Sequence, residues 1–132
     1  TFTQPFTVLP ELNLNISFDT LGCNPHTIEV DNNTIGALFY FWEFGDGFID
    51  NAIAPVHTYT NFIQGDSIYH LTYIARGYAG CADTIYQDVY VFQVPEAQFT
   101  ANPVTQTFPN ATVNITDLSN AGNVNYTWNL GD

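Results

Sequence analysis

The side chains that could bind a ligand here are acids and histidines. Asp46 and Asp50 lie close together in the segment 46–50, and both could offer a carboxylate oxygen to Ca²⁺. The segment lacks the dense oxygen ligands of a dedicated calcium loop, so these two are weak calcium candidates, and we expect no other metal or cofactor. His57 has no other histidine at a metal-ligand spacing, so we expect it to hydrogen-bond nearby backbone.

Residues that could act as nucleophiles have no visible activating partner. Ser17, Ser67 and Ser119 lack the glycine elbow that exposes a catalytic serine. Glycine-rich loops that hold phosphate or a dinucleotide are absent from the sequence. We therefore expect a protein that is not an enzyme.

The charge balance limits the partners of the chain. There are 13 acidic residues and a single lysine or arginine, Arg76, which gives a formal net charge of −12. Nucleic-acid binding depends on lysine and arginine contacts to phosphate, so nucleic acid is excluded as a partner. No apolar run approaches the roughly 20 residues of a membrane span, so we expect a chain that is not membrane-embedded. The composition fits an extracellular β-rich protein.

These residues must be positioned by strands and turns. The segment 38–44 is apolar and aromatic, as in a strand, and Gly45-Asp46-Gly47 ends it with a reversal, after which 54–59 returns. The end of the chain repeats the pattern, because Trp128 stands 86 positions after Trp42 and is followed by Gly131-Asp132. This recurrence predicts a tandem array.

The signature resembles that of PKD domains, which are immunoglobulin-like modules. The resemblance rests on the following residues: Trp42, Phe44, Gly45, Asp46, Gly47, Pro55, His57, Tyr59, Trp128, Gly131 and Asp132. It implies an all-β, immunoglobulin-like antiparallel β-sandwich in which Trp42 and Tyr59 belong to the core and the Tyr59 hydroxyl bonds backbone. The Gly-Cys elements at Cys23 and Cys81 resemble repeats of large Bacteroidota surface proteins, such as gliding-motility adhesins secreted by the type 9 system.

Alternating apolar residues and turn signals predict the strands of the modules. The expected strands are 13–18, 27–30, 38–44, a short piece in 48–53, 54–59, 67–75 and 84–94. Pro-Glu pairs near both junctions suggest three parts: 1–10 as the last strand of a preceding module, 11–95 as a complete module, and 96–132 as the first half of the next. Either the parent chain or a partner would complete that half.

Two covalent features follow from the resemblance. Both cysteines fall within one module of an extracellular-looking chain, so we expect a Cys23–Cys81 disulfide, with two free thiols as the alternative. Thr20, Ser67 and Thr84 each follow Asp and precede an aliphatic residue, which is the O-glycosylation pattern of exported Bacteroidota proteins.

Side-chain alternation predicts an exposed patch. If Trp42 is buried, then Leu38, Tyr40 and Phe44 also point inward while Phe39 and Phe41 point outward. With the outward residues of neighbouring strands they would form one binding patch: Phe39, Phe41, Ile74, Tyr90 and Phe92. A loop or a sugar covering it, or a bulge in 84–94, would be the alternative.

We weigh two functions. The first is a structural or adhesive repeat of a long extracellular surface filament or adhesin, involved in gliding motility or cell adhesion. The second is an accessory module that binds polysaccharide or protein beside a secreted enzyme. The expected partners are neighbouring modules of the same chain and a protein or polysaccharide surface ligand.

Overall fold

The computed structural model describes residues 8, 10–63, 65–107, 109, 112–120, 125–129 and 131. The chain divides into two compact units, Thr1–Phe92 and Gln93–Asp132, close to the Pro95-Glu96 pair. The strand expected in 1–10 falls almost wholly outside the described residues, as does Asp132 of the repeated signature.

Nearly all regular structure is β, which confirms the expected fold class. The first unit holds β1 (Ile16–Ser17), β2 (Leu21–Cys23), β3 (His26–Glu29), β4 (Asp31–Asn32), β5 (Ala37–Glu43), β6 (Ile49–Asp50), β7 (Val56–Tyr59), β8 (Ser67–Gly77), the 3-10 turn η1 (Tyr78–Gly80) and β9 (Ala82–Phe92). The second unit holds β10 (Phe99–Asn102) and β11 (Asn114–Asp117).

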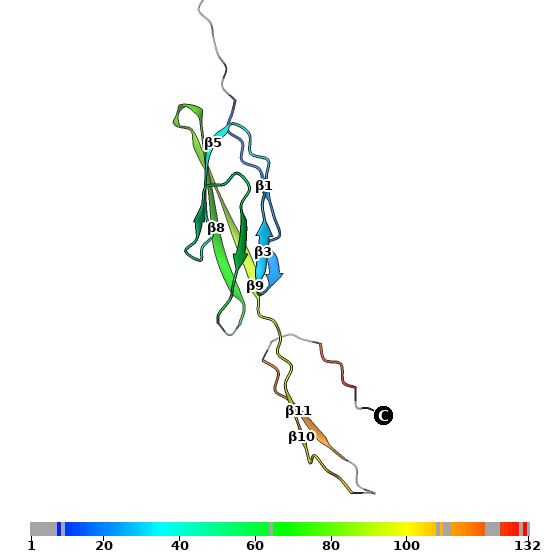
Figure 1. The fold of residues 1–132 in the computed structure, drawn as a ribbon. Coiled ribbons are helices and arrows are strands. Elements are labelled where there is room, and N and C mark those ends of the chain that lie inside the picture. The colour runs from blue at the N-terminus through cyan, green and yellow to red at the C-terminus, as the bar shows by residue number, and fades with distance from the viewer. Residues whose placement is uncertain are drawn as a thin grey trace, which may run out of the picture. The chain divides into compact units, whose positions relative to one another are not determined.

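One layer of the first unit is a five-stranded sheet in the order β2-β9-β8-β5-β6 (Figure 1). The long antiparallel pair β8–β9 is its centre, with Tyr73 opposite Ile85, and β5 follows with Trp42 opposite Tyr73. Because side chains alternate along a strand, this register places Trp42, Tyr73 and Val89 on the same inner face.

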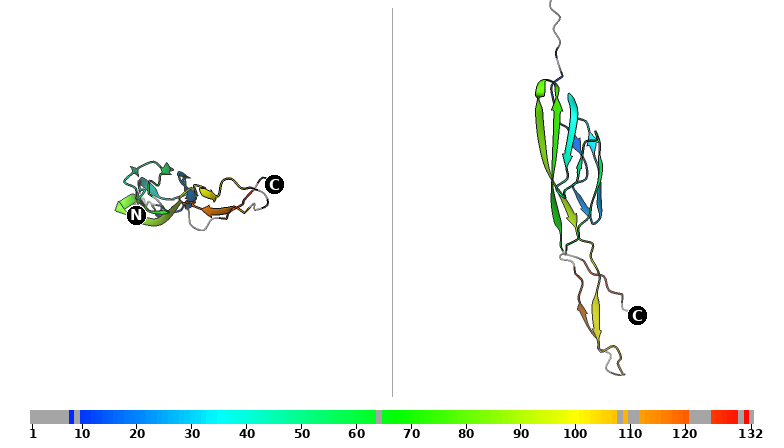
Figure 2. Two further views of the ribbon diagram at one scale, coloured as in Figure 1. Left: turned by 90° about the horizontal axis from the view of Figure 1, so that it is seen from below. Right: turned by 60° about the vertical axis from the view of Figure 1, so that its left-hand side comes forward.

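The other layer combines the pairs β1–β4 and β3–β7. The segment that contains β3 and β4 links these two pairs. The Val30 N–H donates to the Pro55 carbonyl just before β7, and the Asn33 N–H donates to the Asn15 carbonyl just before β1. Figure 2 shows the two layers from a second direction. The arrangement is an immunoglobulin-like sandwich.

The core lies between the layers. The Trp42 and Tyr73 rings stack at 4.0 Å between centroids, and the Trp42 indole N–H donates to the Ala52 carbonyl at 2.9 Å. Among the described residues, the buried hydrophobic side chains are Ile28, Val30, Trp42, Phe44, Tyr59, Leu71, Tyr73, Ala75, Val89 and Val91. The expected burial of Trp42, Phe44 and Tyr59 is confirmed.

The structure corrects three local expectations. β2 was expected to be a loop, but it crosses to the first layer and runs parallel to β9, so the sandwich is not wholly antiparallel. β4 also lies outside the expected strands. Leu38 was expected to point inward, but a register irregularity between Ala37 and Phe39 leaves it exposed.

The second unit is a small antiparallel pair. β10 and β11 pair with Phe99 opposite Asp117, and the Phe99 and Trp128 rings meet edge to face at 5.3 Å. Trp128 is 45% exposed there, whereas Trp42 is fully buried in the first unit. The described part of this unit has only two strands, so it buries far less apolar surface than the first.

Candidate functional site

The signature turn joins β5 to β6, and its Asp46 reaches across to His57 on β7. The Phe44 N–H donates to the Phe48 carbonyl, and one Asp46 carboxylate oxygen accepts from the Phe48 N–H at 3.1 Å. The other oxygen lies 2.8 Å from His57 Nε2. Asp46 therefore accepts from a turn amide. His57 was expected to bond backbone, but its partner is the Asp46 carboxylate.

His57 is held by rings as well as by Asp46. Its imidazole stacks on Phe44 at 4.1 Å and meets Tyr59 edge-on at 4.7 Å. The His57 and Asp46 side chains are only 12% and 15% exposed. This packing makes the pair a structural clamp between two strands, because both side chains are almost fully used by neighbours.

The two calcium candidates already have hydrogen-bond donors. Besides the Asp46 contacts, Asp50 accepts from the N–H groups of Asn51 and Ala52 at 2.6 and 2.9 Å. Within the described residues, no group of three or more His, Cys, Asp or Glu side chains could hold a metal ion. Calcium binding by Asp46 and Asp50 stays a prediction.

The Tyr59 hydroxyl differs from expectation. Its ring lies between Tyr69, stacked at 4.8 Å, and the edges of His57 and Phe44, and the hydroxyl is buried with no hydrogen-bond partner. Burial raises the pKa of Tyr59 above its ordinary value, and the nearby Asp46 charge adds to this. Tyr69 supplies a hydroxyl bond to backbone instead, donating to the Thr60 carbonyl at 3.1 Å.

The expected Cys23–Cys81 disulfide is wrong for this fold. Both cysteines are free and exposed. Cys23 pairs with Phe92 at one end of β9, whereas Cys81 precedes Ala82 at the other end. A strand of 11 residues spans about 35 Å at about 3.3 Å per residue, but a disulfide needs Cα atoms within about 7 Å.

The predicted single patch is divided into two. Phe41 lies opposite Ile74, and Ile74 lies opposite Thr84, so Phe39, Phe41 and Ile74 share the end of the outer face near η1. Tyr90 and Phe92 lie beside β2, about 20 Å further along β9. Tyr86 and Asp88 separate the two groups on the same face.

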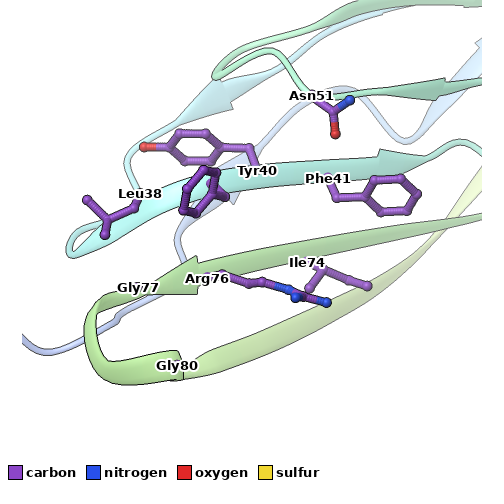
Figure 3. Close-up of a pocket in the computed structure, with 9 residues that line it drawn as sticks. Leu38, Tyr40, Phe41, Asn51, Ile74, Arg76, Gly77 and Gly80 are labelled. Atoms are coloured by element: carbon purple, nitrogen blue, oxygen red, sulfur yellow. The ribbon is translucent and has the colours of Figure 1, made fainter.

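The first group lines an open groove of about 850 Å³, shown in Figure 3. Its lining residues are Leu38, Phe39, Tyr40, Phe41, Asn51, Ile74, Arg76, Gly77 and Gly80. Phe39 is 68% exposed, and the Arg76 side chain extends along β8 toward Ile74. The sequence did not predict Arg76 and Asn51 at this site. Arg76 is the single lysine or arginine of the sequence, and that fact could have pointed to it.

The three candidate glycosylation residues lie at accessible positions of the first unit. Thr20 precedes β2, Ser67 begins β8, and Thr84 faces outward from β9 opposite Ile74. All three are half-buried. Their modification stays a prediction.

Comparisons with known proteins bear on the fold. No family model and no curated protein matches the sequence. The PKD1 domain of Vibrio anguillarum Epp is 21% identical over 66% of this chain and 98% of its own, with a TM-score of 0.47. The PKD1 domain of the Vibrio cholerae metalloprotease PrtV is 22% identical over 64% and 99%, with a TM-score of 0.46.

A third solved structure extends over more of the chain. It is described as carbohydrate-binding modules from the β-sandwich superfamily with promiscuous specificity, and is 13% identical with a TM-score of 0.52. The match covers 76% of this chain and 50% of that one. This likeness supports the β-sandwich fold. In addition, no helix among the described residues is long and apolar enough to cross a bilayer.

Proposed function

We propose that this chain is a non-catalytic, PKD-like segment of an extracellular surface protein, in which each module acts as a spacer and an adhesive unit. The observation that carries the proposal is the signature turn, because it forms the clamp of the first unit and its sequence recurs at Trp128 and Gly131. Gly45 has φ of 82° and Gly131 has φ of 83°, so both glycines have the positive φ that favours glycine.

Strand pairing adds support for the repeat. Ile16 lies opposite Asn32 in β1–β4, and Phe99 lies opposite Asp117 in β10–β11. The partner positions Asn32 and Asp117 are 85 residues apart in the sequence, close to the tryptophan spacing. Ile16 and Phe99 are 83 residues apart, so the two pairs correspond to within two residues, as two related modules with a shifted register would give.

The charged and reactive groups of the first unit fit a binding role better than catalysis. Asp46 and His57 form a hydrogen-bonded pair, but both are packed against rings and backbone. In the described residues no serine, threonine or cysteine is bonded to His57. The groove near η1 is open and carries exposed aromatic rings, which are typical anchors at binding surfaces. The parent protein would be a filament or adhesin exported by the type 9 system and used in gliding or adhesion.

Surface labelling of intact cells tests this proposal. Antibodies raised against residues 11–95 should label unpermeabilised cells of the native organism, and brief protease treatment of those cells should remove the signal. Labelling only after permeabilisation would contradict an extracellular role.

The exposed rings of the groove also favour a second candidate, an accessory module that binds polysaccharide or protein beside a secreted enzyme. The antigen recovered in the same experiment separates the two functions. A very long chain with many modules supports the filament, whereas a chain with one catalytic neighbour and co-purifying hydrolase activity supports the accessory module.

O-glycosylation belongs to the same proposal. Thr20, Ser67 and Thr84 are expected to carry glycans in native material, because each lies where a sugar can extend into solvent. Glycopeptide mass spectrometry checks this, and native peptides with all three residues unmodified would contradict it.

A further inference from the structure

The groove near η1 owes its shape to the pairing of β5 with β8. Phe39 lies opposite Arg76 and Phe41 opposite Ile74, so two phenyl rings and a guanidinium stand side by side on the outer face. The irregularity before Phe39 turns Leu38 outward and adds its side chain to the rim. The result is an apolar floor with one cationic group.

The adjoining turn leaves this end of the groove open. Gly80 has φ of 79°, and a Cβ placed on it would meet nothing within 4 Å. Gly77 also adds no side chain, because a Cβ there would come within 2.6 Å of the Gly36 carbonyl oxygen. A ligand can therefore approach Arg76 past the turn without meeting a side chain from either glycine.

The charge of the groove is opposite to that of the chain. Arg76 is the only lysine or arginine in a chain with a net charge of −12, and none of the lining residues is acidic. At physiological salt the Debye length is about 8 Å, so distant acids are largely screened while Arg76 acts directly on a bound group. A guanidinium can bind a carboxylate through two parallel, charge-assisted hydrogen bonds.

We propose that this groove binds an acidic saccharide whose pyranose rings carry carboxylates, such as a uronate polymer. The carboxylate would pair with Arg76, and the apolar C–H face of the sugar would lie against Phe39 and Phe41, whose ring faces carry partial negative charge. The Asn51 amide, on the opposite side of β5 in Figure 3, would bond ring hydroxyls. This rests on the proposed adhesive function and names its ligand.

The form of the groove favours a saccharide over an acidic peptide. A peptide anchor needs an enclosed pocket for a side chain, whereas this site is an open depression with Phe39 mostly exposed. Exposed aromatic rings with a few polar groups suit a pyranose, because its C–H face can pack on a phenyl ring while its hydroxyls form hydrogen bonds.

Titration of the ¹⁵N-labelled chain with trigalacturonate tests the proposal. The backbone amide chemical shifts of β5, β8 and η1 should change on binding. Trigalacturonate whose carboxylates are methyl-esterified should bind much more weakly. Arg76→Gln should weaken binding about ten-fold or more, since a charge-assisted bidentate contact is lost, and Arg76→Lys should retain part of it. Phe39→Thr and Phe41→Thr should also weaken binding.

Controls separate ligand contact from damage to the fold. Tyr86→Thr removes an exposed ring from the same sheet face outside the groove and should leave binding unchanged. The Arg76, Phe39 and Tyr86 variants should keep the wild-type urea midpoint within a small margin, because these side chains are exposed. Phe41 is half-buried, so Phe41→Thr should lower the midpoint and the Phe39 variant is the cleaner test.

Three results would overturn the inference: no shift changes at millimolar ligand, equal affinity for the esterified sugar, or unchanged affinity in Arg76→Gln. Hexaglutamate binding at the groove as tightly as trigalacturonate would also overturn it in favour of an acidic peptide. None of these results affects the surface labelling that tests the proposed function, so the two can fail separately.

Discussion

Replacing Tyr59 with phenylalanine should stabilise the first unit. The Tyr59 hydroxyl is fully buried and has no hydrogen-bond partner, so folding removes its hydrogen bonds to water and replaces them with none. Mutational data place the cost of such a group at about 1–3 kcal/mol. Part of that gain is offset because the missing oxygen leaves a small void, so we expect the free energy of unfolding to rise by about 1 kcal/mol.

Tyr73→Phe is the matched control with the opposite sign. The Tyr73 hydroxyl donates to Thr34 Oγ1 at 3.0 Å and accepts from Asn32 Nδ2 at 3.3 Å. Its removal should cost about 1–2 kcal/mol, because two bonds of modest net value are lost and their partners are left unpaired.

Urea denaturation monitored by tryptophan fluorescence measures the change in the free energy of unfolding for both variants. With an m-value of about 1.5 kcal/mol/M, Tyr59→Phe should raise the midpoint by about 0.7 M and Tyr73→Phe should lower it by a similar amount or more. A loss of 1 kcal/mol or more in Tyr59→Phe would refute the reasoning, since it would mean that the Tyr59 hydroxyl has a bonding partner after all.

The remaining predictions concern pH, one glycine and the thiols. The pKa of Tyr59 is raised in the fold, so the unfolded chain loses that proton at a lower pH than the folded chain does. The free energy of unfolding should therefore fall above about pH 10, by up to about 1.4 kcal/mol per pH unit. Tyr59→Phe should lack this part of the loss in urea titrations at alkaline pH. Gly45→Ala should lower the free energy of unfolding by about 2–4 kcal/mol, because φ is 82° and a Cβ would come within 2.7 Å of the His70 backbone. Gly47→Ala has open space around it and should lower it by only about 1–2 kcal/mol. Equal urea midpoints for the two variants would contradict the close approach of Gly45 to His70. Iodoacetamide without reductant should add two alkyl groups to the native chain at Cys23 and Cys81, and an intact mass without any addition would contradict the free thiols.

Much of the fold follows from local signals in the sequence. Trp42 had to be buried, and alternation from it gave the correct inward side chains of β5 from Tyr40 onward. The same parity held for Leu71 and Val89 on the neighbouring strands. These predictions succeed because the side-chain period of a strand is two and one buried anchor fixes it.

What sequence reasoning missed depends on contacts between distant segments. The exposure of Leu38 arises from one irregular pair with β8, which no local pattern encodes. β2 is only the three residues Leu-Gly-Cys, too short to show a strand pattern, and its pairing with β9 makes it a strand. The expected disulfide failed for the same reason, since the separation of Cys23 and Cys81 is set by the length of β9.

The candidate site shows the same division. Phe39, Phe41 and Ile74 were predicted from parity, and the structure brings them together. Joining them to Tyr90 and Phe92 was wrong, because position along the strand axis depends on the register of β8 with β9. Asn51 enters the groove from a loop, where alternation gives no guide.

The parallel pairing of β2 with β9 has a mechanical consequence. The chain enters β2 from the amino-terminal side and leaves β9 toward the carboxyl terminus, and the two strands run in the same direction. Tension between the ends of this unit would therefore slide the strands past each other along their axes. The hydrogen bonds from Tyr90 N–H to Thr20 and from Asn24 N–H to Phe92 would then be loaded in shear and break together, not one after another. Single-molecule stretching of the unit should show a distinct force peak. Tyr90→Pro should lower that peak, because proline has no N–H to donate.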